Sequence, residues 1–173
     1  MLNKRRDCGL ADLLEGDKTA FDSVYEELKI PVFTVIYRIT QDRMLAEDVM
    51  HDSFIKLFQP PHSSRIRNPR AWIYQMARNL AIDSVRKNKT DALPENMPDS
   101  CKPMEDAVID RADTEAAINL LSREEREIVT LHINAGLKFR EIAEIIEIPL
   151  GTVLWKYQKA IGALRSYLNG GSI

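Results

Sequence analysis

Basic and amide side chains gather on one predicted helix near the C-terminus, residues 150–168. Its charged side chains are Lys156, Lys159 and Arg165, and none of its residues is acidic. Ammonium and guanidinium groups replace counterions along a phosphate backbone, and a helix fits the major groove of DNA. Gln158 can pair with the edge of adenine, and Lys159 with that of guanine. The pattern favours a DNA-binding helix over the alternative, a surface helix whose lysines are merely solvated.

A shorter amphipathic helix must position this basic helix. Phe139, Ile142 and Ile146 recur on it at helical spacing, and Pro149 ends it because proline disfavours helical geometry in the residue before itself. Two helices joined by a tight turn, the second of them basic, are typical of a helix-turn-helix. The candidate DNA-contacting residues of this motif are Arg140, Thr152, Trp155, Lys156, Gln158 and Lys159. Two alternatives stay open for Trp155: contact with a thymine methyl group, or burial against the first helix of its domain.

A second basic stretch runs from His62 to Thr90 and contains Asp83 as its one acidic residue. Asn68 and Pro69 predict the start of a helix there, because asparagine caps a helix and proline presets its first turn. This helix is expected to cover residues 69–87 and to bury Trp72, Ile73, Met76, Leu80 and Val85. Arg70, Arg78 and Arg86 repeat every eight residues, so they drift slowly around one face, close to Gln75 and Asn79. Such a face can bind phosphate through its guanidinium groups while the amides address bases.

Acidic residues mark another predicted helix, over residues 44–58. Asp48 and Asp52 lie one turn apart beside His51, opposite an apolar face. A solvated face is one interpretation. A metal site is another, because Asp48-x-x-His51 has the carboxylate–histidine spacing of di-iron bundles. That site needs the same element twice, and the three histidines of the chain supply no second copy, so we expect no metal.

The composition is that of a soluble, all-helical protein. The 173 residues are 45% hydrophobic and 29% charged, with net charge −2, so any basic surface must be local. No apolar run approaches the roughly 20 residues of a membrane helix, so we expect no membrane insertion. Cys8 and Cys101 have neither metal-ligand nor redox spacing, which favours a reducing cytoplasm and no disulfide.

The chain is expected to contain two small helical domains joined by a flexible linker. Residues 1–88 form the first domain, with a kink or restart at Pro31, and residues 113–173 form the second, which contains the helix-turn-helix. Residues 89–112 form the linker, because they are acidic, rich in proline and poor in apolar side chains.

Several segments together resemble the extracytoplasmic-function sigma factors of the sigma-70 family. The resemblance covers nearly the whole chain, and its specificity comes from the order and separation of the segments. Those segments are Gly16–Phe21, Ala46–Phe54, Ala71–Asp83, Leu121–Glu127, Glu141–Ala143 and Pro149–Val153.

The resemblance implies a dissociable subunit of bacterial RNA polymerase that directs the enzyme to promoters and helps to melt the −10 element. It implies that the acidic helix contacts the core polymerase through Glu47, Asp48, His51 and Asp52. It implies that the first domain binds −10 DNA through His62, Ser63, Ser64, Arg65, Arg70, Gln75, Arg78, Asn79 and Arg86, the first four of them in a loop that captures a flipped base. The helix-turn-helix would then read the −35 element, and an anti-sigma factor would hold the protein inactive.

The chain departs from the family pattern on its recognition helix. The positions after Val153 usually carry a basic, a small polar and another basic residue, whereas here they are Leu154, Trp155 and Lys156. Lys138 stands where a serine or threonine cap is common. Fewer cations predict a shallower salt dependence of DNA binding or an unusual −35 sequence.

Two other functions remain as alternatives. One is a stand-alone helix-turn-helix regulator with an N-terminal helical sensor domain, and the other is a helical bundle that binds only proteins. In the leading interpretation the chain is not an enzyme, needs no cofactor, binds no small-molecule substrate and works in the cytoplasm.

Overall fold

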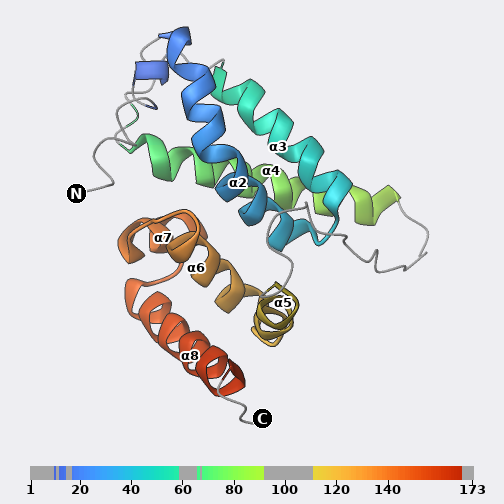
Figure 1. The fold of residues 1–173 in the computed structure, drawn as a ribbon, viewed down its shortest axis with the longest axis vertical. Helices are drawn as coiled ribbons and strands as arrows, with labels where there is room; N and C mark the ends of the chain where they lie inside the picture. The colour runs from blue at the N-terminus through green and yellow to red at the C-terminus, as the bar shows by residue number, and fades with distance from the viewer. Residues whose placement is uncertain are drawn as a thin grey trace. The chain divides into compact units, whose positions relative to one another are not determined.

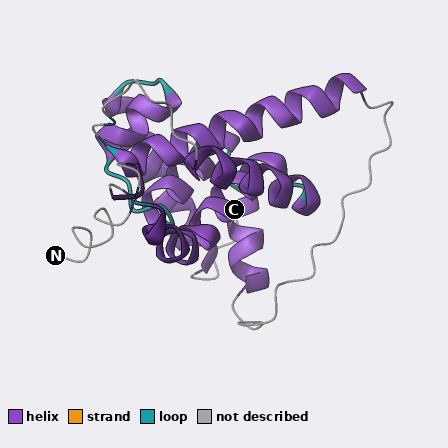
Figure 2. Ribbon diagram, turned by 90° about the horizontal axis from the view of Figure 1, so that it is seen from above, coloured by secondary structure: helices purple, strands orange, loops and turns teal. Residues whose placement is uncertain are grey.

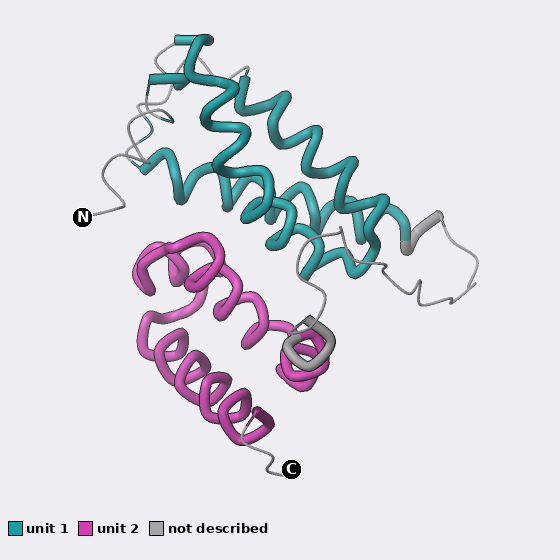
Figure 3. The backbone as a smooth tube through the Cα atoms, viewed as in Figure 1, with its two compact units in different colours: residues 1–93 teal, residues 94–173 magenta. Residues whose placement is uncertain are grey.

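The computed structural model describes residues 10, 12–14, 17–58, 66, 68–91 and 111–168. Every regular element within these residues is a helix (Figure 2), which confirms the all-α prediction. The chain divides into two compact units, Met1–Leu93 and Pro94–Ile173 (Figure 3). Among the helices described, none is long and apolar enough to cross a membrane.

The first unit is built from three long helices. A 3-10 turn, η1 (Lys18–Ala20), leads into α2 (Phe21–Thr40), which is followed by α3 (Arg43–Phe58) and α4 (Pro69–Asp91). Each of the three long helices packs against the other two (Figure 1). They bury one shared core, since burial of apolar surface is the main force that holds helices together. Its fully buried side chains include Val32, Ile36, Leu57, Ile73 and Tyr74.

Helix α2 continues through Pro31 as one helix, so of the two expectations for Pro31, a kink or a restart, the restart does not occur. Proline removes one backbone hydrogen bond and crowds the preceding turn. Here Val24 and Leu28 before it and Val32 and Ile36 after it are all buried on the same face. Tertiary packing on both sides of the proline therefore maintains the helix.

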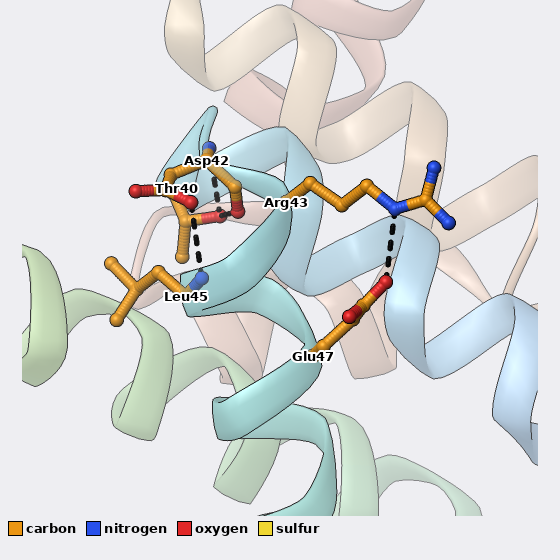
Figure 4. Close-up of polar contacts among 5 residues, drawn as sticks. All are labelled: Thr40, Asp42, Arg43, Leu45 and Glu47. Atoms are coloured by element: carbon orange, nitrogen blue, oxygen red, sulfur yellow. Dashed lines mark hydrogen bonds and ion pairs between the residues drawn. The ribbon is translucent and has the colours of Figure 1, made fainter. Parts of the chain in front are cut away.

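Side-chain caps define where α3 and α4 begin. The Asp42 carboxylate accepts a hydrogen bond from the Leu45 N–H at 3.0 Å, and the Thr40 hydroxyl donates to the Asp42 carbonyl at 3.1 Å (Figure 4). Asn68 accepts from the Ala71 N–H at 3.1 Å, which confirms the predicted start of α4. These caps satisfy N–H groups that have no partner within the first turn.

The inner face of α4 differs from the predicted one. Its buried residues are Arg70, Ile73, Tyr74, Ala77 and Ala81. The predicted core residues Trp72, Met76, Leu80 and Val85 are only half-buried. Alanines at the centre of the face let the neighbouring helices approach closely, and the larger side chains are displaced to the rim of the contact.

The ends of the predicted linker are helical in the structure. Helix α4 extends to Asp91, beyond its predicted end at Lys87, and α5 (Arg111–Asn119) begins inside the predicted 89–112 segment. The remaining linker residues, 92–110, lie outside the described part of the chain.

The second unit consists of α5, α6 (Arg123–Ile133), α7 (Phe139–Ile146) and α8 (Leu150–Leu168). Helix α8 packs against each of the other three. The fully buried side chains of this unit include Ile128, Leu131, Leu137, Ile142 and Val153.

Helices α7 and α8 form the predicted helix-turn-helix. Glu147 ends α7 in the left-handed region with φ 58°, and Pro149 precedes α8. Three rings lie together where α6, α7 and α8 meet: His132 stacks on Phe139 at 4.2 Å between ring centroids, and Tyr157 contacts both rings edge-on. The basic helix is therefore held from two sides.

Candidate polymerase and nucleic-acid interfaces

Helix α3 exposes the predicted acidic face. Glu47, Asp48, His51 and Asp52 are all exposed to solvent. At 100° per residue the four side chains cover an arc of about 140°, so they form one face. Glu47 also pairs with Arg43, whose Nε lies 2.9 Å from the Glu47 Oε1 (Figure 4).

Two apolar side chains on this face were missed by the sequence reasoning. Met44 is 76% exposed and Ile55 is 47% exposed, and they lie in line with Asp48 and His51. The 4-3-4 spacing of these four positions, which is the spacing of a helix–helix seam, was the available signal. The face thus combines negative charge with exposed apolar surface.

A metal site on this face finds no support among the described residues. Nowhere in that part of the chain do three or more His, Cys, Asp or Glu side chains come together as a metal would need.

Helix α4 places Gln75, Arg78, Asn79 and Arg86 on one side, apart from Arg70, which is buried. Gln75 and Asn79 are exposed one turn apart, and Arg78 is half-buried. Arg86 is exposed and lies 3.1 Å from the Asp83 carboxylate. These residues leave amide groups open to a partner, with guanidinium groups nearby.

Arg70 does not share that exposed face. Its residue surface is only 7% exposed, and its guanidinium lies 3.9 Å from the Glu27 carboxylate of α2. Pairing with an acid of the neighbouring helix accounts for a buried arginine better than phosphate contact does. The predicted loop residues His62, Ser63, Ser64 and Arg65 lie outside the described residues.

The outer face of α8 presents an indole and an amide. Trp155 is 58% exposed, so it is not buried against another helix. Gln158 and Arg140 are also exposed, while Thr152 is half-buried at the start of α8. An exposed face of this kind can reach base edges in a major groove.

The two lysines of α8 pair with carboxylates of α6. Lys156 Nζ lies 2.9 Å from the Glu124 Oε2, and Lys159 Nζ lies 2.8 Å from the Glu125 Oε1. Both ammonium groups also approach the Trp155 ring, at 5.9 and 5.6 Å from its centroid. The sequence predicts solvated or DNA-bound lysines here, whereas in the structure both lysines join α8 to α6.

Glu125 is the electrostatic centre of this arrangement. It completes a capping box with Ser122: its Oε2 accepts from the Ser122 N–H at 3.0 Å, and the Glu125 N–H donates to the Ser122 hydroxyl at 3.4 Å. Burial raises the pKa of the Glu125 carboxyl, but hydrogen bonds from Lys159 and Ser122 outweigh burial and lower the pKa to about 2. Glu125 is therefore ionised at neutral pH.

Comparisons with known proteins match both units in order. The family model described as Sigma-70 region 2 matches residues 24–90, and that described as Sigma-70, region 4 matches residues 111–164. The ECF RNA polymerase sigma factor SigW of Bacillus subtilis is 29% identical over an alignment of 186 positions that covers 97% of each chain. SigL of Mycobacterium tuberculosis is also 29% identical, over 83% of this chain and 85% of the relative.

Solved structures share the fold. The sigma factor RpoE, in complex with the anti-sigma factor NepR from Bartonella quintana, superposes with a TM-score of 0.62 at 21% identity, over 85% of this chain and 97% of that one. CnrH, in complex with the cytosolic domain of CnrY, has the same TM-score at 16% identity, over 96% of this chain and 99% of that one. The chain therefore belongs to the extracytoplasmic-function sigma factors of the sigma-70 family.

Proposed function

We propose that this chain binds core RNA polymerase, directs it to a small set of promoters and assists the melting of the −10 element. The observation that carries this proposal is the presence of both sigma-70 regions, in order, in one chain. Two separate helical units can hold two promoter elements at once when a larger enzyme supports them.

Helix α3 is the proposed contact with the core polymerase. Its exposed Glu47, Asp48 and Asp52 offer negative charge to a basic partner, and Met44 and Ile55 offer apolar anchors in the same stripe. Charge complementarity steers such an association, and the apolar anchors supply affinity.

The two units divide the promoter between them. In the first unit, Gln75 and Asn79 of α4 are the proposed −10 contacts, supported by the nearby Arg78 and Arg86 and by the loop residues 62–65. In the second unit, α8 is the proposed reader of the −35 element in the major groove. Arg140 in the first turn of α7 and Thr152 in the first turn of α8 are further proposed DNA contacts. Arg70 is assigned to the packing of the first unit.

The chain itself performs no catalysis in this proposal, because nucleotide addition belongs to the core polymerase. It needs no cofactor, binds no small-molecule substrate and works in the cytoplasm with the polymerase. RpoE and CnrH were solved with protein partners, and this likeness supports a protein inhibitor of anti-sigma type for this chain as well.

Reconstituted transcription tests the proposal. Core polymerase and genomic DNA of the encoding organism, with and without the purified chain, should yield discrete new transcripts only with the chain. The double variant Asp48→Asn/Asp52→Asn should lose them through weaker core binding, while Glu144→Gln, which removes an exposed charge from the second unit, should retain them. If the chain adds no transcript but binds duplex DNA alone, the stand-alone regulator replaces this proposal.

A further inference from the structure

We infer that Lys156 and Lys159 are positioning residues, held by Glu124 and Glu125, and that the exposed Trp155 beside them makes the −35 base contact. The inference rests on the proposed function and names the part of the recognition helix that carries specificity. It assigns Lys159 a different role from the guanine contact that its position in the sequence suggests.

The ion pairs restrain both lysines toward the protein. Lys156 has only 22% of its side chain exposed, and its Nζ is 2.9 Å from Glu124. Lys159 Nζ is 2.8 Å from Glu125, whose other oxygen is already bonded to the Ser122 N–H. To reach a base, Lys159 must leave a buried carboxylate that has no other charge partner among the described contacts, which is unfavourable.

Glu125 thereby links the orientation of two helices. One carboxylate caps the N-terminus of α6, and through Lys159 it also holds the middle of α8. A fixed carboxylate at this point therefore helps to hold α8 against α6.

Trp155 is the side chain that this arrangement presents outward. Trp155 and Lys159 are one helical turn apart, so their side chains are neighbours on the surface of α8. Two ammonium groups within 6 Å of the ring centroid restrict the indole through cation–π attraction. A large, restrained aromatic ring left in water is the type of side chain that dominates binding when covered. In a major groove its apolar partner is the thymine methyl group.

The charge balance of α8 supports the same conclusion. Glu124 and Glu125 offset the two lysines, and Arg165 in the last turn is the other cation of the helix. A helix with so little uncompensated charge gains little from phosphate, so contacts with bases must supply more of its affinity for DNA.

The experiment uses the full chain assembled with core polymerase and promoter duplexes selected by this holoenzyme from a library randomised at −35. Affinities are measured for the selected duplex, for every single-base variant, and for duplexes with uracil in place of each −35 thymine. The variants are Lys159→Met, Glu125→Gln, their double variant and Trp155→Ala. Glu144→Gln serves as the charge control and Leu168→Ala as the control for an exposed apolar side chain on α8.

The affinity of wild-type holoenzyme should fall about fourfold when uracil replaces one particular thymine. Uracil lacks the thymine methyl group, and burial of one such group accounts for a change of this size. Trp155→Ala should be indifferent to that replacement, whereas Leu168→Ala should behave as wild type. Lys159→Met and Glu125→Gln should each lower the ratio of specific to scrambled-sequence affinity by about fivefold to tenfold. The double variant should lower this ratio by no more than the single variant with the larger loss, because both substitutions remove the same interaction.

Four results would overturn the inference. A selective loss at a single base pair in Lys159→Met, beyond that of Glu125→Gln, makes Lys159 a base reader. A fall of about 1 in the salt slope of Lys159→Met makes it a phosphate contact. If Trp155→Ala weakens binding to core polymerase in the absence of DNA, Trp155 contacts the polymerase and not a base. If no thymine of the selected −35 element is sensitive to replacement by uracil, Trp155 does not contact a thymine methyl group. Failure of the proposed function is distinct, because wild-type holoenzyme would then select no sequence at all.

Discussion

Loss of the Glu125 charge should destabilise the second unit in a pH-dependent way. The pKa of Glu125 falls from 4.5 to about 2 in the folded protein. If the whole pKa change is counted, ionised Glu125 adds about 3 kcal/mol to the free energy of unfolding at neutral pH. The Lys159 side chain is 59% exposed, so solvent screening reduces the pair's share, and we expect a net effect of about 1–2 kcal/mol.

The sign of the pH dependence follows from the lowered pKa. An acid that ionises more readily in the folded state stabilises the fold above its unfolded pKa. This contribution should be fully present above about pH 4.5 and should disappear as the pH falls toward 2. Glu125→Gln, which keeps an oxygen for the Ser122 N–H, should therefore differ from the parent protein at pH 7 and converge with it in acid.

The two tryptophans make the assay specific to one unit. Trp72 belongs to the first unit and Trp155 to the second, so a Trp72→Phe background leaves fluorescence that reports on α8. Urea unfolding in this background, with and without Glu125→Gln, measures the difference in free energy at each pH. Equal stability at pH 7, or a difference that persists unchanged near pH 2, would refute the role assigned to the Glu125–Lys159 pair. Glu144→Gln should show no comparable pH dependence.

Three further substitutions test the packing and caps that position the interfaces. Ser122→Ala should cost the second unit about 1 kcal/mol through loss of the α6 cap, as measured by urea unfolding; no change would mean that Glu125 alone caps the helix. Gly162→Ala should stabilise α8 by about 0.5–1 kcal/mol, because a Cβ there meets nothing within 4 Å; destabilisation in thermal unfolding would show a hidden clash. Leu57→Ala should cost the first unit about 2–5 kcal/mol by opening a cavity in its core, and a smaller loss would mean that the site collapses; Trp72 fluorescence in a Trp155→Phe background follows this unfolding.

Local signals in the sequence predicted most of the elements. Asn68 before Pro69 is a short-range signal, and the structure contains the capping hydrogen bond that it predicts. The turn at Pro149 likewise predicted the helix-turn-helix. Rules of this kind succeed because the partner atoms lie within one turn of the same helix.

Contacts between helices escaped the sequence reasoning. The buried face of α4 is centred on Ala77 and Ala81, which hydrophobic periodicity ranks below Met76 and Leu80. The pairing of Arg70 with Glu27 and that of Lys159 with Glu125 join residues on different helices. A pattern along one helix does not reveal which charge of another helix lies opposite, so arginines and lysines that look available for DNA in the sequence are partly used within the fold.

The most direct test of the central claim compares three mixtures on one labelled promoter duplex selected by the holoenzyme: the chain alone, core polymerase alone, and both together. The account predicts a stable, sequence-specific complex only when both are present, because neither unit of the chain is expected to hold DNA without the polymerase. Equally tight and specific binding by the chain alone, or no specific complex when both are present, would contradict it.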